Sequence, residues 1–169
     1  DLKRHQEFSG KNLEYFEEST KEKFVPYIIE TSAGCDRMFL ALMCDAYREE
    51  VVSTDGVKED RRIVLGFDPR LAPVKLAVLP LSKKPPLQEL GHSVREKLAS
   101  KWVVQYDETG SIGKRYRRQD EIGTPLCATV DFESLEDKKV TVRHRDTMTQ
   151  DRVEIDQLES YLEDKLANF

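Results

Sequence analysis

Residues 30–42, ETSAGCDRMFLAL, place a small-residue turn, an acid and an arginine directly before one of the most apolar stretches of the chain. Residues from about 34 to 49 are apolar on nearly every side, which predicts a helix that is largely buried. Arg37 falls in the first turn of that helix, where the macrodipole disfavours a cation by roughly 0.3 to 1 kcal/mol. Arg37 therefore needs an anionic partner.

Two kinds of partner suit Arg37. Asp36 or Glu30 could hold it in a structural ion pair within the chain. An anionic ligand is the alternative, because the small residues at 32–34 let backbone approach closely and a guanidinium matches the geometry of a phosphate. The segment by itself leaves both interpretations open.

The residues around this segment divide into two regions of different pattern. Residues 1–30 alternate short apolar runs with Gly, Asn, Ser and Thr turns, which predicts β structure. Residues 49–61 are polar, with a Gly turn, and lead to a further short strand. The Pro-rich stretch DPRLAP then predicts a domain boundary near 68–73. The strands predicted in this half are LKRHQEF (2–8), LEYF (13–16), FVPYIIE (24–30) and RIVLGF (62–67).

Beyond the boundary, strands alternate with helices. VKLAVLPL (74–81) is a near-continuous apolar run, as expected for a strand covered on both faces. This alternation favours an α/β layer fold with a mainly parallel sheet. The further predicted elements are strands at 102–107 and 125–132, helices at 85–100 and 111–123, a hairpin of 138–145 with 151–155, and a closing helix at 156–166.

Composition excludes several classes of protein. Lys and Arg number 27 against 32 Asp and Glu, so a nucleic-acid partner requires a local basic patch rather than a global field. Cys35, Cys44 and Cys127 form no CxxC pair, which argues against a metal site and favours a reducing, cytoplasmic location. The longest apolar run, 38–44, is too short to span a membrane. The chain begins without Met, and we expect it to be a piece of a longer protein.

FVPYIIETSAGCDRMFLAL resembles the third signature motif of class II aminoacyl-tRNA synthetases, in which a strand ending in Glu precedes a helix with an Arg near its start. The form E-x-S-x-G-x-D-R is similar to the homodimeric type of glycyl-tRNA synthetase. The resemblance continues through DLKRHQEFSGKNLEYF, RLAPVKLAVLPL, DETGSIGKRYRRQDEIGTPLCATVDF and VTVRHRDTMTQDRV. It implies an α/β chain: the end of a class II antiparallel-sheet catalytic domain at 1–67, with motif three at 24–45, and a mixed-sheet anticodon-binding domain at 68–169.

The resemblance also implies roles for residues of the motif. The motif-three arginine of the family holds ATP, a role that falls on Arg37. The family's Glu and Ser, here Glu30 and Ser32, bind the glycine substrate. The implied glycine-binding residues are Glu30, Thr31, Ser32, Ala33 and Gly34. The implied ATP-binding residues are Gly34, Cys35, Asp36 and Arg37. Mg²⁺ is implied by the family, with no ligand identified in this sequence.

The first two class II motifs, with the arginine that contacts the α-phosphate, are absent from this sequence. The resemblance therefore implies that these 169 residues do not form glycyl-adenylate alone. The full-length parent, a homodimer, is expected to activate glycine with ATP and to transfer it to the 3′ end of tRNA(Gly). This chain would supply motif three and anticodon recognition.

GSIGKRYRR (110–118) is a second candidate site. It carries Lys114, Arg115, Arg117 and Arg118 with no acid between them. At about 100° per residue these side chains fall within roughly 160° of one another, which predicts a basic outer helix face that contacts tRNA phosphates. A solvated face balanced by nearby acids is the alternative. The resemblance adds Arg143 and Arg145 on the late hairpin as tRNA-binding candidates and leaves the role of His144 open.

Two other functions compete with the ligase interpretation. A synthetase-like paralogue could bind nucleic acid without ligase activity, but the presence of Glu30, Ser32 and Arg37 argues against it. A KH-like RNA-binding module could use GSIG (110–113) as its GxxG clamp. That interpretation leaves segment 1–45 unexplained.

Overall fold

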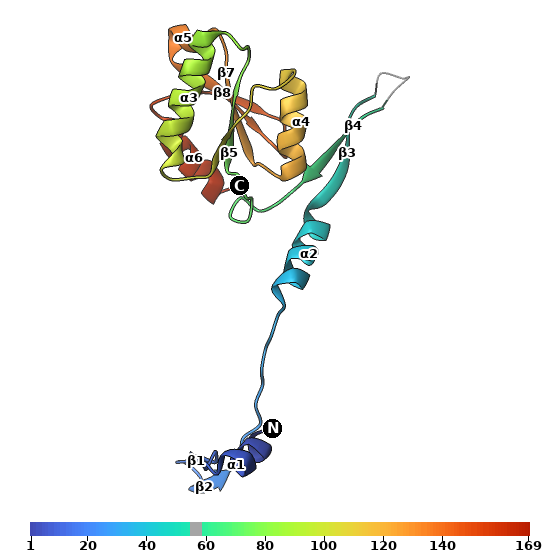
Figure 1. Ribbon diagram of the computed structural model, residues 1–169, viewed down its shortest axis with the longest axis vertical. Helices are drawn as coiled ribbons and strands as arrows, with labels where there is room; N and C mark the ends of the chain where they lie inside the picture. Colours follow the sequence, from blue (N-terminus) through green and yellow to red (C-terminus); the bar gives the residue numbers. More distant parts are fainter. Residues whose placement is uncertain (55–58) are drawn as a thin grey trace. The chain divides into compact units, whose positions relative to one another are not determined.

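The computed structural model describes residues 1–54 and 59–169 (Figure 1). The chain forms two compact units, residues 1–38 and 39–169. The Gly turn predicted within 49–61 falls at Gly56, outside the described residues. The predicted boundary near 68–73 lies inside the second unit, and as a domain boundary of a longer parent it stays a prediction.

The first unit begins with a helix, α1 (Leu2–Ser9), where the sequence predicted a strand. That prediction is wrong, because the stretch has only two apolar residues and its Lys, Arg, Gln and Glu favour a helix. Gly10 ends α1 in the left-handed conformation, with φ at 67°. β1 (Tyr15–Glu17) and β2 (Glu22–Phe24) then pair as an antiparallel hairpin.

Residues 25–34 have no regular secondary structure. The strand predicted at 24–30 is therefore wrong beyond Phe24, where β2 ends. Pro26 lacks the N–H that a paired strand would use, and Tyr27 and Ile29 are almost fully exposed. Apolar character alone did not produce a strand, because no neighbouring strand of the unit pairs with this segment.

Helix α2 (Cys35–Ala46) forms where the sequence predicted it, but it is not largely buried. Ala46 is its one buried residue, whereas the apolar side chains of Met38 and Phe39 are exposed. An apolar helix face needs a covering surface. Among the residues of α2 that the structure describes, only Leu42 and Met43 are half-buried. The prediction that this helix is largely buried is therefore wrong for this chain.

An antiparallel hairpin follows α2 directly. β3 (Tyr47–Thr54) pairs with β4 (Glu59–Leu65), and the Gly66 N–H donates to the Ala46 carbonyl oxygen at 2.6 Å across the base of the hairpin. The strand predicted at 62–67 is confirmed through Leu65. The interpretation of 49–61 as a polar connection is wrong, since most of these residues lie in the two strands.

The rest of the second unit is a mixed five-stranded sheet with the order β6-β5-β7-β8-β9. β6, β5 and β7 are parallel, β8 runs antiparallel to β7, and β9 runs antiparallel to β8 at the edge of the sheet. The α/β fold with a mixed sheet is therefore confirmed. Its strands are β5 (Leu76–Pro80), β6 (Val104–Tyr106), β7 (Leu126–Val130), β8 (Lys139–His144) and β9 (Gln150–Glu154). Its helices are α3 (Pro85–Ala99), α4 (Ile112–Ile122), α5 (Ser134–Asp137) and α6 (Leu158–Ala167). Across the described ranges, no helix is both long and apolar enough to cross a membrane.

Helices cover both faces of this sheet (Figure 1). Leu76 and Val78 of β5 join the main apolar core with residues of α3 and α6. Ala77 and Leu79 point to the other face, where Tyr116 of α4 packs against them. This two-sided burial explains the unbroken apolar run of β5. Helix α4 lies between the sheet and the β3–β4 hairpin.

Candidate functional site

The motif segment has no regular structure up to Gly34 and becomes helical at Cys35. All residues from 30 to 37 are exposed. A Cβ added at Gly34 would meet nothing within 4 Å, so the segment is open on this side. Within this chain the residues predicted to bind glycine and ATP are thus presented to solvent rather than gathered into an enclosed pocket.

Arg37 lies in the first turn of α2. Among residues 1–54 and 59–169, no carboxylate lies within ion-pair distance of its guanidinium, so the structural pairing with Asp36 or Glu30 does not form here. The first N–H groups of a helix also lack intrahelical partners. A free guanidinium and free N–H groups at one helix end fit an anionic ligand such as a triphosphate.

A metal site is a separate question, because the family implies Mg²⁺. The described part of the chain contains no group of three or more His, Cys, Asp or Glu side chains that could hold a metal ion. The residues present therefore do not fit such a site by themselves. No step is assigned to a metal on this chain.

Arg115 is the clearest departure from the predicted basic face. It is buried, and its guanidinium donates to the Gly110 carbonyl oxygen at 2.7 Å and also to that of Pro80. Arg115 therefore does not belong to the exposed face of α4, and the prediction that all four cations form one outer face is wrong. The side chain is long enough to reach main-chain acceptors at the end of β5, and burying a charge is tolerated only when it is fully bonded.

Arg143 and Arg145 are also buried. Arg143 forms two bonds to the Asp120 carboxylate, at 2.8 and 3.0 Å, and its guanidinium lies 4.8 Å from the centre of the Tyr116 ring. Burial disfavours the charged form of Arg143, but the bonds to Asp120 outweigh burial and raise its pKa. Arg145 donates to the Gly123 carbonyl oxygen at 2.9 Å. Both side chains are occupied by internal acceptors, and their predicted contact with tRNA is untested.

His144 lies between these two arginines on β8, and its side chain points elsewhere. Its Nε2 lies 2.9 Å from the Tyr161 hydroxyl, which itself donates to the Asp151 carboxylate at 2.6 Å. His144 thus links the β8–β9 hairpin to α6 and takes no part in the bonds that Arg143 and Arg145 form.

Three cations remain accessible on α4. Lys114 is exposed and has no bonded partner among the described residues. Arg117 pairs with Asp60 at 2.5 Å, and Arg118 pairs with Asp107 at 2.5 Å. These pairs are partly exposed, so solvent and salt weaken them.

The Asp107 carboxyl, which accepts a bond from Arg118, has a lowered pKa. Burial raises the pKa of the Asp107 carboxyl, but the Thr109 N–H and the Arg118 guanidinium both donate to it and bring its pKa below the usual value. The carboxylate therefore stays ionised at neutral pH and competes with any phosphate for Arg118.

Sequence reasoning missed Arg62, Glu50 and Asp120. Arg62 and Asp120 are buried and joined to each other, whereas the sequence analysis placed Glu50 in a polar stretch and considered Asp120 only as one of the nearby acids in the alternative of a solvated helix face. RRIVL (61–65) shows no alternation of charged and apolar residues, so the sequence carried no signal that Arg62 shares a buried strand face with Val64.

Comparison with known proteins identifies the family of most of the chain. The chain matches the family described as "Anticodon binding domain" over residues 75–165. It is 57% identical over 166 residues to a glycine–tRNA ligase of Clostridium acetobutylicum and 56% identical over 167 residues to one of Staphylococcus haemolyticus. These alignments cover 98% and 99% of this chain and 35% of each relative. The chain thus spans about a third of the length of the curated relatives it matches.

A solved structure agrees with the fold. A prolyl-tRNA synthetase from Cryptosporidium parvum aligns with a TM-score of 0.57 and 25% sequence identity, over 63% of this chain and 23% of that chain. The resemblance to glycyl-tRNA synthetases that the sequence predicted is confirmed. The sheet with its flanking helices and the match over 75–165 lead to one conclusion: the chain belongs to the anticodon-binding domain family and is similar, over nearly its whole length, to glycine–tRNA ligases.

Proposed function

We propose that this chain works as part of a glycine–tRNA ligase and supplies both motif three and the anticodon-recognition domain. The observation that carries the proposal is Arg37, a cation at the start of α2 with no ion-pair partner among the described residues, in a chain whose mixed sheet belongs to the anticodon-binding family. The parent would use ATP to convert glycine to glycyl-adenylate with release of pyrophosphate. The 3′-terminal ribose of tRNA(Gly) would then attack the acyl carbon and release AMP.

The residues of the motif have distinct proposed roles. Arg37 binds the triphosphate of ATP, with Gly34, Cys35 and Asp36 beside it. The Glu30 carboxylate pairs with the α-ammonium of glycine, and Ser32 adds a polar contact, with Thr31, Ala33 and Gly34 lining the small site. Such groups act by positioning and charge stabilisation rather than by covalent catalysis. We further propose a homodimeric, cytoplasmic parent, in keeping with the three free cysteines.

The 169-residue chain alone is expected to show no glycine-dependent ATP–pyrophosphate exchange. The reason is that the segment from 30 to 37 is open in this chain, whereas activation requires the adenylate to be enclosed and contacted from several sides. Exchange of labelled pyrophosphate into ATP is the measurement, with the full-length parent as the positive control. Exchange above background by the purified chain would contradict this expectation.

For tRNA binding we propose the three accessible cations of α4, Lys114, Arg117 and Arg118. Three other arginines are less suited to bind phosphate because each is already bonded to internal acceptors: Arg115, Arg143 and Arg145. In the part of the chain that the structure describes, Lys114 has no competing carboxylate, whereas a phosphate must displace Asp60 from Arg117 and Asp107 from Arg118. Lys114 is therefore expected to contribute most.

Replacing Lys114, Arg117 and Arg118 together with Gln in the full-length parent is expected to weaken tRNA binding and to lower the slope of log K against log salt. Each lost phosphate contact removes about one unit from the slope. Filter binding or anisotropy at several salt concentrations measures both quantities. Lys97→Gln on α3, an exposed lysine paired with Asp156, is the matched control. A triple variant with the wild-type slope would show that α4 is a solvated face.

A further inference from the structure

One buried guanidinium joins three separate elements of the second unit. Arg62 of β4 has a fully buried side chain. Its Nε donates to Glu50 Oε2 on β3 at 2.8 Å, and its Nη1 donates to Asp120 Oδ2 on α4 at 3.2 Å. Nη1 also donates to the Arg145 carbonyl oxygen at 2.7 Å, and Nη2 to that of Asp146 at 3.3 Å. Arg62 therefore links the hairpin to α4 and to the turn between β8 and β9.

The contacts of Arg62 belong to a hydrogen-bonded network of charged side chains. Asp120, which is also buried, accepts from Arg62 and takes two further bonds from Arg143. Glu50 supplies the second carboxylate and is partly exposed. In the described residues no buried side-chain polar atom lacks a partner. Such fully bonded networks fix one arrangement of the elements that they join, because any shift leaves a buried charge unpaired.

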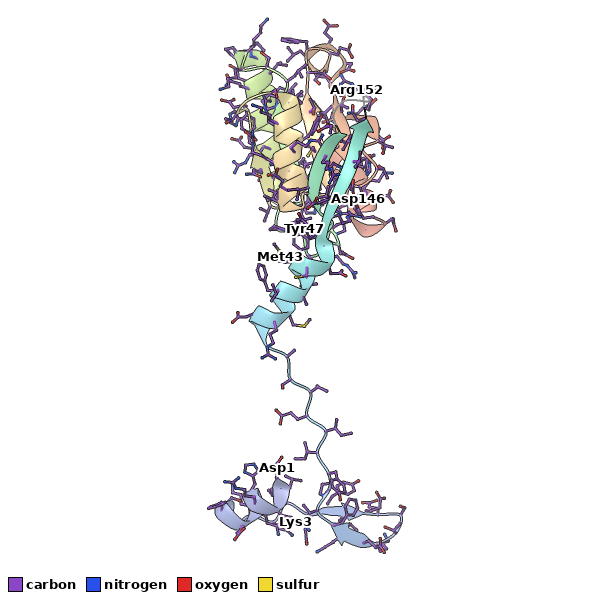
Figure 2. The ribbon with its side chains drawn as sticks, turned by 90° about the vertical axis from the view of Figure 1, so that its right-hand side faces the viewer. Asp1, Lys3, Met43, Tyr47, Asp146 and Arg152 are labelled. Carbon is purple, nitrogen blue, oxygen red and sulfur yellow. The ribbon has the colours of Figure 1, made fainter. Side chains whose placement is uncertain are left out.

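Two further ion pairs between the hairpin and the rest of the unit are exposed and weaker. Arg48 of β3 donates to the Asp146 carboxylate at 2.6 Å, and Asp146 lies beside the hairpin (Figure 2). Asp60 of β4 pairs with Arg117 of α4. Exposed pairs of this kind contribute little, typically about 0 to 1 kcal/mol. Of these charged contacts, those of the buried Arg62 therefore hold the hairpin most firmly.

The hairpin is joined to helix α2 with no residue between them, since α2 ends at Ala46 and β3 begins at Tyr47. The bond from Gly66 to Ala46 ties the helix end to the second strand as well. We infer that Arg62 is a positioning residue for aminoacylation, which couples tRNA bound at the anticodon-binding sheet to the helix that carries Arg37. This inference rests on the proposed ligase function.

The test uses the full-length parent with two variants of Arg62. Arg62→Met removes the charge but leaves Asp120 paired with Arg143. Arg62→Lys keeps a charge but loses the planar fork that reaches four acceptor residues at once, and it serves if the first variant does not fold. Arg48→Met, which removes one exposed contact between the same hairpin and turn, is the matched control.

The decisive measurement is the aminoacylation kcat with unmodified tRNA(Gly) and with a transcript carrying one changed anticodon base. In the wild-type parent the changed base is expected to lower kcat. In Arg62→Met and Arg62→Lys that loss should shrink by at least about fivefold, the lower end of typical coupling between sites. Pyrophosphate exchange without tRNA should stay within about twofold of wild type, because Arg62 touches neither ATP nor glycine.

Each outcome bears on the inference. A full anticodon effect on kcat in both variants, whatever their thermal stability, would overturn the positioning role, because a purely structural residue alters stability and not the coupling. An equal loss of the anticodon effect in Arg48→Met would also overturn it. If the wild-type parent lacks glycine-dependent pyrophosphate exchange, the proposed function fails, and this inference fails with it.

Discussion

Asp120→Ala is expected to destabilise the 39–169 unit by about 3 to 5 kcal/mol, the usual cost of removing one partner from a buried ion pair. The change leaves the buried guanidinium of Arg143 without its two bonds to Asp120 and removes the bond from Arg62 to α4. The buried Arg143 then lacks its carboxylate, whereas Arg62 keeps the carboxylate of Glu50. This cost exceeds that of Arg62→Met, which keeps the pair between Asp120 and Arg143.

Urea unfolding of the chain measures this effect. Trp102 is the only tryptophan and packs against the main core, so its fluorescence reports the second unit. With a slope of about 2 kcal/mol/M, the midpoint should fall by about 2 M. Asp156→Ala is the control, because its side chain is 97% exposed and its pair with Lys97 lies at the surface. Equal midpoints for the two variants would show that the buried network contributes no net stability.

Arg37→Ala in the full-length parent is expected to lower kcat/KM for ATP in pyrophosphate exchange by about 100-fold. A bidentate contact between a guanidinium and a phosphate comprises two charge-assisted bonds, each worth about 1.5 to 3 kcal/mol. Arg37 has no carboxylate partner in the described part of the chain, so its removal breaks no internal pair. The effect should therefore fall on ATP use and not on folding.

Two further variants sharpen this experiment. Arg37→Lys keeps the charge without the fork and should give an intermediate loss. Arg70→Ala removes an exposed arginine, 85% accessible, that pairs only with its neighbour Asp68, and it should leave kcat/KM unchanged. If Arg37→Ala matched Arg70→Ala, Arg37 would not contact ATP and the ligand interpretation of the motif would be wrong.

The sequence predicted the second half of the chain better than the first. Strands β5 and β7 were predictable because both are buried on two faces and read as unbroken apolar runs. The helix stripe at Leu87, Val94 and Leu98 on α3 likewise faces the core. In the first half, apolar residues at 24–30 suggested a strand, but strands require a pairing partner that local pattern does not supply.

The sequence by itself determined the order of elements from residue 74 onward apart from the short helix α5, the helix start after Gly34, and the family to which the chain belongs. Only the tertiary structure decided what each arginine does. Arg37 and Lys114 have no partner within residues 1–54 and 59–169, whereas Arg62 and Arg115 are buried on internal acceptors. Helical periodicity gives the direction of a side chain around its own axis, but the fate of a long cation depends on which carboxylates and carbonyls other elements bring within its reach.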